Sequence, residues 1–262
     1  MLKAVAPYRP LLAVLAAAWP VWGWYQSRAL HGSEDPVELL ALVTAAVLFI
    51  RQGGPFAPLR PWQWIAASAL LLLYAFTFAA VYPMVRAGLL VMILGVLVWN
   101  TRAALALSML LCLSLPVSAT LQFFLGYPLR LVVAEASRSI LTGCGWPVVR
   151  VGTALHWAGE TILVDAPCSG LKMLWAGCFF AAALACWRQL SAPRTVLLLA
   201  AGVPVLVGAN IARATLLFFK ESGLVALPSW THPALGLVIF GGAALALLKA
   251  SRRLTPATTT TA

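Results

Sequence analysis

The sequence predicts an all-α membrane protein, a polytopic bundle of about eight transmembrane helices with a small amphipathic helix and a β-hairpin on the periplasmic face. Three observations support this prediction. Of the 262 residues, 62% are hydrophobic and only 10% are charged, whereas soluble domains carry about 25% charged residues. The mean hydropathy is +0.93. The chain also contains 11 Trp, 17 Pro and 19 Gly, and these residue types are common in and around membrane helices.

The formal net charge of +11 would suit nucleic-acid binding, but the distribution of the charges excludes that class. Nucleic-acid-binding domains gather their Lys and Arg residues on one face or segment. Here the basic residues occur a few at a time between apolar runs, with no long Lys/Arg run. Such spacing is typical of orientation signals in membrane proteins. We therefore expect a lipid bilayer, and no nucleic acid, as a partner.

The apolar runs define the candidate spans, the second and fourth of which fall short of the usual ~17–25 residues. In chain order they cover residues 10–26, 36–50, 62–82, 84–99, 103–125, 168–187, 194–220 and 234–250. No convincing cleavage site follows the first span, so we interpret it as a retained helix. With the N-terminus in the cytoplasm, basic residues favour the cytoplasmic loops, and all seven acidic residues fall on the outer side or its boundary. This predicts a multi-pass inner-membrane protein with both termini cytoplasmic.

The segment from 126 to 167 has a different pattern. Its run LRLVVAEASRSILTG places charged residues opposite apolar ones at helical spacing, which predicts an amphipathic helix on the outer surface. The run VVRVGTALHWAGETILVDAP then alternates with a period close to two. It predicts a short β-hairpin with Gly152 and Gly159 as turn points.

We expect a single integral membrane domain over residues 1–262. Residues 1–102 would hold the N-terminal spans, and residues 103–250 would form the catalytic core that contains the candidate residues. Residues 251–262, which end in a Thr-rich stretch, would form a disordered tail.

Cys168 is the first candidate for chemistry. It begins the sixth span directly after Pro167, a residue that suits the first turn of a helix. The free backbone N–H groups and the dipole at a helix N-terminus favour a thiolate. Lys172 would lie one turn further along the same face and add positive charge. For the cysteines in the middle of spans, a small apolar side chain is the simpler interpretation.

Arg213 and His232 are the other two candidates. Arg213 lies inside the seventh span, about 10 Å below its outer end, where a charge costs ~2.5–3.5 kcal/mol and usually faces a polar cavity. Asn210 shares its helix face, and His232 begins the eighth span. The topology therefore brings a thiol, a guanidinium and an imidazole to one leaflet. The structural alternatives are that Arg213 snorkels to the headgroups and that His232 is an interface residue.

These residue types predict acyl transfer through a thiol. His232 would take the proton of Cys168, the thiolate would attack a backbone carbonyl, and Arg213 would stabilise the oxyanion or orient the substrate. Water would then resolve the acyl-enzyme in a peptidase, and an amine would do so in a transpeptidase. Ser169 is a weaker candidate nucleophile, since no base is placed better for it. We expect no metal and no cofactor, because paired-His and Cys-x-x-Cys spacings are missing from the sequence.

At these positions the sequence resembles the exosortase/archaeosortase family of multi-spanning cysteine transpeptidases. The first matching block is Ala-Pro-Cys-Ser-Gly-Leu around Cys168, the second is Asn-Ile-Ala-Arg from Asn210 to Arg213, and the third is His232 followed by Gly236. The blocks stand in the family's order and spacing, and the resemblance covers about residues 110 to 245. The resemblance implies that Cys168 is the nucleophile and that Arg213 and His232 complete a triad. The archaeal branch has Arg in the third place, so His232 is similar to the bacterial exosortase branch.

The resemblance also implies a substrate class. The family cleaves exported proteins next to C-terminal sorting signals that consist of a short motif, a membrane span and basic residues. In the bacterial branch the signal is of the PEP-CTERM type, and the setting is often exopolysaccharide production. We expect Asn210, Lys172, Ser169 and Asp165 to bind substrate or support the triad, on a site that faces the periplasm.

A second hypothesis comes from another class of protein. The chain could be a non-catalytic transporter or an accessory membrane component of exopolysaccharide assembly, in which Arg213 lines a substrate path and Cys168 is incidental. Substitution of Cys168 by Ala or Ser discriminates between the two hypotheses. The sequence leaves open the substrate motif, the acceptor nucleophile and the oligomeric state.

Overall fold

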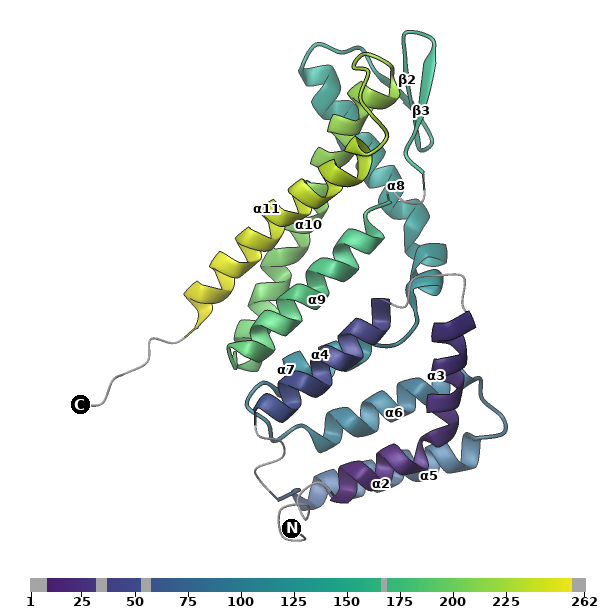
Figure 1. Ribbon diagram of the computed structural model, residues 1–262, viewed down its shortest axis with the longest axis vertical. Coiled ribbons are helices and arrows are strands. Elements are labelled where there is room, and N and C mark those ends of the chain that lie inside the picture. Colours follow the sequence, from purple (N-terminus) through teal and green to yellow (C-terminus); the bar gives the residue numbers. More distant parts are fainter. Residues whose placement is uncertain (1–8, 32–36, 53–57, 166–168, 256–262) are drawn as a thin grey trace, which may run out of the picture. The chain divides into compact units, whose positions relative to one another are not determined.

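A computed structural model describes residues 9–31, 37–52, 58–165 and 169–255 (Figure 1). These residues form helices and one small antiparallel sheet of three strands. The chain divides into two compact units, each with its own core. The first unit comprises residues 1–116, 182–196 and 259–262, and the second comprises residues 117–181 and 197–258.

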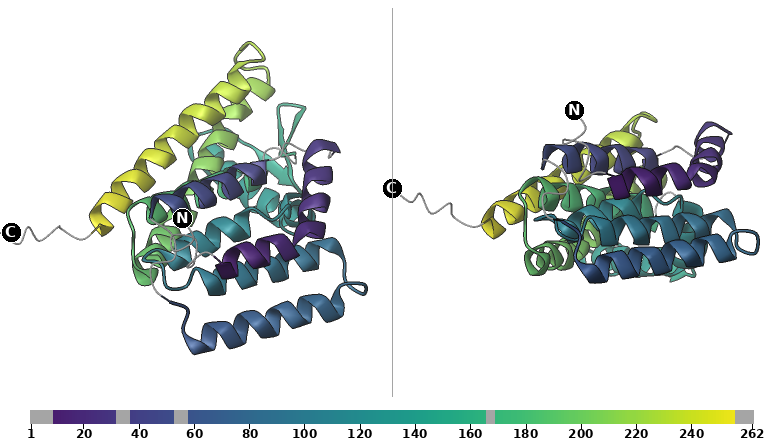
Figure 2. Two further views of the ribbon diagram at one scale, coloured as in Figure 1. Left: turned by 60° about the horizontal axis from the view of Figure 1, so that its bottom comes forward. Right: turned by 90° about the horizontal axis from the view of Figure 1, so that it is seen from below.

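The first unit is a layered bundle of apolar helices. Its helices are α2 (Arg9–Ala17), α3 (Trp19–His31), α4 (Val37–Arg51), α5 (Pro61–Thr77), α6 (Pro83–Leu97) and α7 (Ala104–Leu113). Helix α6 packs against α5 and α7, and α7 also packs against α4. Figure 2 shows α5 and α6 running side by side, joined by a short loop. Small and large buried residues alternate in this layer, for example Ala41, Ala45, Leu107 and Leu110.

Gln63 is a fully buried amide in the first turn of α5. Its Nε2 donates to the carbonyl oxygen of Val96 at 2.7 Å, and its Oε1 accepts from the backbone N–H of Arg60 at 2.9 Å and from Asn100 Nδ2 at 2.8 Å. Because a buried amide without partners is costly, these bonds explain how a polar side chain is accommodated here. They fasten the start of α5 to the end of α6.

The second unit combines long helices with the sheet. Its elements are α8 (Ser118–Gly143), β1 (Val149–Val151), β2 (Ala154–Trp157), β3 (Glu160–Leu163), α9 (Leu171–Trp187), α10 (Ala192–Glu221) and α11 (Thr231–Leu254), of which α9 and α10 extend into the first unit. The strands pair antiparallel in the order β1-β2-β3. Gly152 and Gly159 have φ of +60° and +88° at the two turns, so both predicted turn points are confirmed. The sheet has one strand more than the predicted hairpin, because the residues before Gly152 also pair.

The core of the second unit lies between the sheet, α8 and the end of α10. Leu155 and Ile162 pair across β2 and β3 and point into this core together with Val133 of α8 and Phe218 of α10. Aromatic edge contacts join Trp157 to Phe218 with ring centroids 6.0 Å apart. In Figure 1 the hairpin of β2 and β3 lies beside the ends of α8 and α10. The C-terminal third of α10 is therefore held on two sides.

Two predicted spans differ from the observed helices. The predicted span 10–26 is divided into α2 and α3 at Ala18, because Pro20 has no N–H and favours the first turn of a new helix. The predicted span 103–125 is also interrupted. Helix α7 ends before Pro116, and α8 starts at an angle of 91° and continues to Gly143. The second half of that span and the predicted amphipathic helix are thus one helix.

Two of the described helices, α10 and α11, are long and apolar enough to cross a membrane, with mean hydropathies of 2.1 and 1.9 over their best windows. A third span is added if the bent pair α7 and α8 crosses as one unit, and α6 and α9 are shorter apolar helices. The chain is a multi-pass membrane protein. Helix α11 continues through Leu254, so the first four residues of the predicted tail 251–262 are helical, and residues 256–262 lie outside the described part.

Candidate active site

Arg213 and His232 form a pair between two long helices of the second unit. Arg213 Nη2 lies 3.0 Å from His232 Nε2. Arg213 is in α10, His232 is the second residue of α11, and both side chains are half-buried. A guanidinium only donates hydrogen bonds, so His232 Nε2 is the acceptor and the ring proton of the neutral imidazole is on Nδ1.

The turn between α10 and α11 brings these two residues together. Helix α10 ends at Glu221, and Gly223 follows with φ of +75°, a conformation that terminates helices and suits glycine. At the start of α11, Thr231 Oγ1 donates to the carbonyl oxygen of Pro228 at 2.6 Å. This bond helps to fix the first turn of α11, which presents His232 to α10.

Gly236 leaves the space that the Arg213 side chain occupies. It lies one turn after His232 on α11, and a Cβ atom at this position would stand 3.2 Å from Arg213 Nε. That distance is tighter than ordinary contact, so a larger residue would push the guanidinium away. The His-x-x-x-Gly spacing in the sequence therefore corresponds to an imidazole and a gap that accept the same arginine.

Two charged residues beside this pair, the acceptor Glu221 and the donor Lys220, were not predicted as site residues from the sequence. Glu221 Oε1 lies 3.6 Å from His232 Nδ1 and 3.3 Å from Lys220 Nζ. Glu221 is eight residues after Arg213, which corresponds to about 12 Å along a helix and a rotation of about 80°. The sequence places both residues on one helix. The role of Glu221 becomes recognisable only when the position of His232 is known.

The residues after Cys168 are held by a second set of contacts in the same unit. Ser169 is buried, and its Oγ donates to Gln122 Oε1 at 3.2 Å and accepts from the backbone N–H of Leu171 at 3.3 Å. Gln122, on α8, was not singled out in the sequence because it is one amide in an apolar run. The Ser169 hydroxyl thus closes the turn that leads into α9, a structural role for the residue considered as a second nucleophile.

Gly170 packs directly against Asn210, which is also buried. Gly170 has φ of +84°, and a Cβ atom there would stand 2.5 Å from Asn210 Nδ2. No L-residue fits this position without displacing Asn210. Since Asn210 is one turn before Arg213 on α10, the Ser-Gly of the first motif and the Asn-x-x-Arg of the second are packed together. A cavity of about 10 Å³ between them, lined by Ser169, Gly170 and Asn210 with apolar neighbours such as Val133, is the size of about one water molecule.

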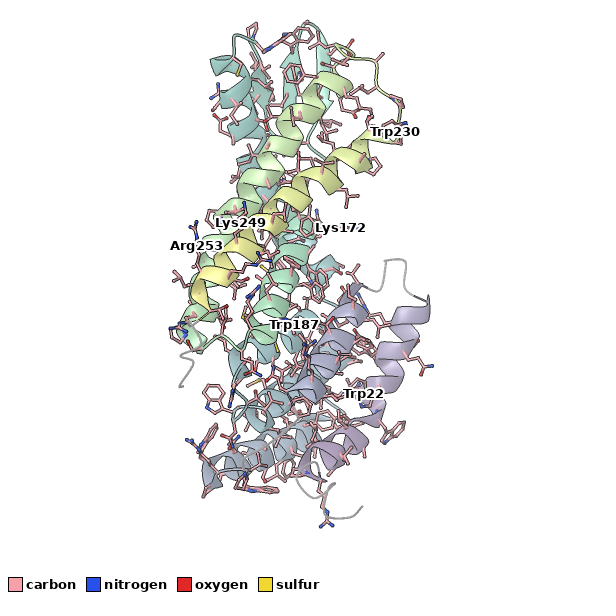
Figure 3. The ribbon with its side chains drawn as sticks, turned by 60° about the vertical axis from the view of Figure 1, so that its left-hand side comes forward. Trp22, Lys172, Trp187, Trp230, Lys249 and Arg253 are labelled. Carbon is pink, nitrogen blue, oxygen red and sulfur yellow. The ribbon has the colours of Figure 1, made fainter. Side chains whose placement is uncertain are left out.

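Cys168 itself lies outside the described residues. Among the described residues, the helix predicted to begin at 168 is interrupted at Gly170, whose φ of +84° is absent from right-handed helices, and α9 begins at Leu171. Lys172 is exposed on the first turn of α9, where Figure 3 labels it. Asp165 is exposed at the end of the segment that follows β3.

The carboxylate of Glu135, in the part of α8 that lies beyond the predicted span, has a strongly shifted pKa. Arg138 and Arg150 donate hydrogen bonds to its carboxylate and lower its pKa from 4.5 to about 2. Arg150 belongs to β1, so this carboxylate ties the sheet to α8. Among the described residues, no group of three or more His, Cys, Asp or Glu is placed to hold a metal ion.

Comparison with known protein families identifies the chain's relatives. A model of the transmembrane exosortase family (Exosortase_EpsH) matches residues 8–249. The chain belongs to this family. No curated protein and no solved structure matches it. The resemblance drawn from the three motifs is thus confirmed at the level of the family, and the match also covers the N-terminal helices that contain none of those motifs. The exosortase motifs that the structure describes all lie in the second unit.

Proposed function

We propose that this exosortase-family protein is a cysteine peptidase or transpeptidase that cleaves C-terminal sorting signals of the PEP-CTERM type from exported proteins. The observation that supports this most is the pairing of Arg213 with His232 at 3.0 Å. The Ser169–Gly170 stretch packs on Asn210, one turn before Arg213. Cys168 precedes that stretch directly in the chain.

In the proposed reaction, the thiol proton of Cys168 passes to His232, and the thiolate attacks the scissile carbonyl carbon. The tetrahedral intermediate collapses as the C–N bond breaks, and the imidazolium returns the proton to the leaving amine. The thioester is then attacked by water, which gives hydrolysis, or by an amine, which gives transpeptidation. Each step conserves protons, and the thiol is regenerated at the end.

Arg213 has two roles in this proposal. Its bond to His232 Nε2 fixes which ring nitrogen is the base. A guanidinium also has further N–H groups that can donate to an oxyanion as charge develops on the carbonyl oxygen. His232 Nε2 can accept the thiol proton only when Arg213 releases it, so the proposal couples base release to oxyanion binding by Arg213.

We further propose eight spans in the inner membrane, with both termini in the cytoplasm and the site facing the periplasm. Helix α11 supports this orientation, because Trp230 stands at its start and Lys249 and Arg253 near its end, as Figure 3 shows. Aromatic residues favour the interface, and Lys and Arg favour the cytoplasmic side. A substrate whose sorting signal contains its own span would meet this site from within the bilayer.

The test replaces Cys168 by Ala and, separately, by Ser. Both variants should lose processing of a coexpressed substrate with a sorting signal, while the amount of protein in the membrane stays at the wild-type level. Cys144→Ala is the matched control, since Cys144 is an exposed cysteine of the same unit. It should process normally. Normal processing by Cys168→Ala would instead support the non-catalytic alternative. The mass of the new C-terminus distinguishes hydrolysis from transfer to an acceptor.

A further inference from the structure

Glu221 lies on the opposite side of the His232 ring from Arg213. Its Oε1 is 3.6 Å from His232 Nδ1, while Arg213 Nη2 is 3.0 Å from His232 Nε2. The first distance is longer than a hydrogen bond, so the contact is an electrostatic one between a carboxylate and the N–H side of the ring. Both nitrogens of the imidazole therefore face a charged group from α10.

The charges of the two partners select one orientation of the ring. A guanidinium can only donate and a carboxylate can only accept. The other tautomer, with the proton on Nε2, would place an N–H against Arg213 and a lone pair against Glu221, which is unfavourable at both ends. A ring flip would replace both nitrogens at these contacts by carbon atoms. The pair on α10 thus sets the tautomer as well as the direction of the ring, which is the task of the third group in nucleophile–base–orienter arrangements.

The end of α10 is held in a position from which Glu221 contacts His232. Glu221 is the last residue of α10, directly before the turn at Gly223, and the preceding turn of α10 is anchored by Phe218 and Phe219. Phe219 contacts Trp146 with ring centroids 5.5 Å apart. The aromatic core beside the sheet thus holds the end of α10, which carries Glu221 to His232.

Lys220 is the other charged group in contact with Glu221. Its Nζ lies 3.3 Å from the same Oε1 that faces His232. This ion pair restrains the carboxylate, whose side chain is 46% exposed. Among the residues that the structure describes, the charged groups in contact with the His232 ring or with the Glu221 carboxylate are Arg213, Glu221 and Lys220.

From this arrangement we propose that Glu221 is a positioning residue that holds the His232 ring with Nε2 toward Arg213. The expected effect on catalysis rests on the proposed function. The contact between Glu221 and His232 can be tested without a substrate.

The test uses the full-length protein with Glu221→Gln, Glu221→Asp and the matched control Glu160→Gln, an exposed glutamate in the sheet. Diethyl pyrocarbonate modifies imidazole nitrogen, and the rate is measured for each histidine peptide by mass spectrometry. His156, which contacts Thr161 Oγ1 at 3.0 Å on the sheet, is the internal reference. In Glu221→Gln the rate at His232 should rise severalfold while the rate at His156 stays constant. Glu221→Asp should lie between, because it keeps the charge.

Substrate processing gives the second readout. Glu221→Gln should lower kcat roughly 10–100-fold, as removal of orienting partners does elsewhere, with KM unchanged and partial recovery in Glu221→Asp. An unchanged labelling rate at His232, an equal rise in Glu160→Gln, or an unchanged kcat would each overturn the proposal. If Cys168→Ala still processes substrate, the proposed function fails, whereas the labelling ratio still tests the contact of Glu221 with His232.

Discussion

The two units each contain a polar cluster among apolar helices, and the clusters differ in what they bond to. In the first unit, Gln63 is fully buried and bonds mainly to backbone groups and to Asn100 at the ends of α5 and α6. In the second unit, Arg213 and His232 are half-buried and bond to each other through side-chain nitrogens. Buried polar groups need partners in both cases, but only the second cluster leaves reactive atoms accessible.

This difference separates a structural role from a chemical one. The Gln63 amide completes helix ends, so its removal should change stability and leave chemistry alone. The Arg213–His232 pair consists of a guanidinium donor and an imidazole that can accept a proton. Substitution of Arg213 or His232 should lower the rate of substrate processing and leave the stability of the helix bundle largely unchanged. The experiments below test this separation, starting from the largest expected effect.

Among the variants that test this separation, Arg213→Lys should give the largest loss of function. A lysine keeps the charge but has neither the planar fork nor the reach to donate to His232 and an oxyanion together. We expect the processing rate to fall by about 10²–10³-fold, the range for loss of an oxyanion donor, with a near-wild-type unfolding temperature in detergent. Arg253→Lys, near the other end of α11 from His232, is the control and should process normally. Equal losses in both variants would mean that the exchange of arginine for lysine lowers processing wherever it is made, and that the contact of Arg213 with His232 is not the cause.

Gly170→Ala should cost the most stability. A left-handed conformation costs a residue with a Cβ atom about 1–2 kcal/mol, and the new methyl group would also stand 2.5 Å from Asn210 Nδ2. The unfolding temperature of the extracted protein measures the effect. Because Asn210→Ala removes the atoms that collide, the double variant should be more stable than the sum of the two single variants predicts. If the two changes in the free energy of unfolding are strictly additive, the residues at positions 170 and 210 do not interact.

The sequence predicted well those features that depend on local chemistry. The turns at Gly152 and Gly159 were expected because positive φ is a property of glycine itself, and both are present. The membrane class follows from composition, since hydropathy reports the solvent around a segment. The same measure does not report where the backbone bends. Hydropathy therefore predicted neither the 91° bend before Ser118 nor the continuation of α8 to Gly143. Apolar residues continue across Pro116, whereas the helix ends before it.

The candidate site shows the same limit. Arg213 and Asn210 could be singled out because a charge and an amide within an apolar span are costly. Gln122 and Glu221 could not, since their meaning depends on Ser169 and His232 being brought to them from distant parts of the chain. The start of α9 was placed too early because Pro167 suits a first turn, whereas Gly170 adopts φ of +84° against Asn210. Tertiary packing decides that conformation.

Gln63→Leu should show the opposite profile to Arg213→Lys. It leaves the carbonyl of Val96, the N–H of Arg60 and the Asn100 amide without their bonds to the side chain, which costs about 1–3 kcal/mol for a buried group left unsatisfied. We expect a lower unfolding temperature and a lower amount of protein in the membrane. The processing rate per folded molecule should be unchanged. A large fall in that rate would contradict the separation of roles between the two units.

The smallest expected effect concerns the carboxylate that ties β1 to α8. Hydrogen bonds from Arg138 and Arg150 lower the pKa of Glu135 from 4.5 to about 2. A carboxyl whose pKa is lower in the folded state stabilises the fold above the unfolded value and loses that contribution as pH falls through the folded value. Wild type should therefore be slightly more stable than Glu135→Gln at pH 6, and the difference should shrink as pH falls from about 4.5 toward 2.

The control for this effect is Glu160→Gln, which changes the net charge equally at an exposed position of the sheet to which Arg150 ties Glu135. The unfolding temperatures of wild type and both variants, measured across this pH range, separate a specific ion pair from general charge. Because the Glu135 pairs are partly exposed, salt should weaken their contribution. A difference that stays constant down to pH 2 would mean that Glu135 acts through packing and not through its charge. Since α8 contributes Val133 and Leu141 to the core that holds Phe218 of α10, the processing rate of Glu135→Gln also tests how rigidly that core must hold Glu221.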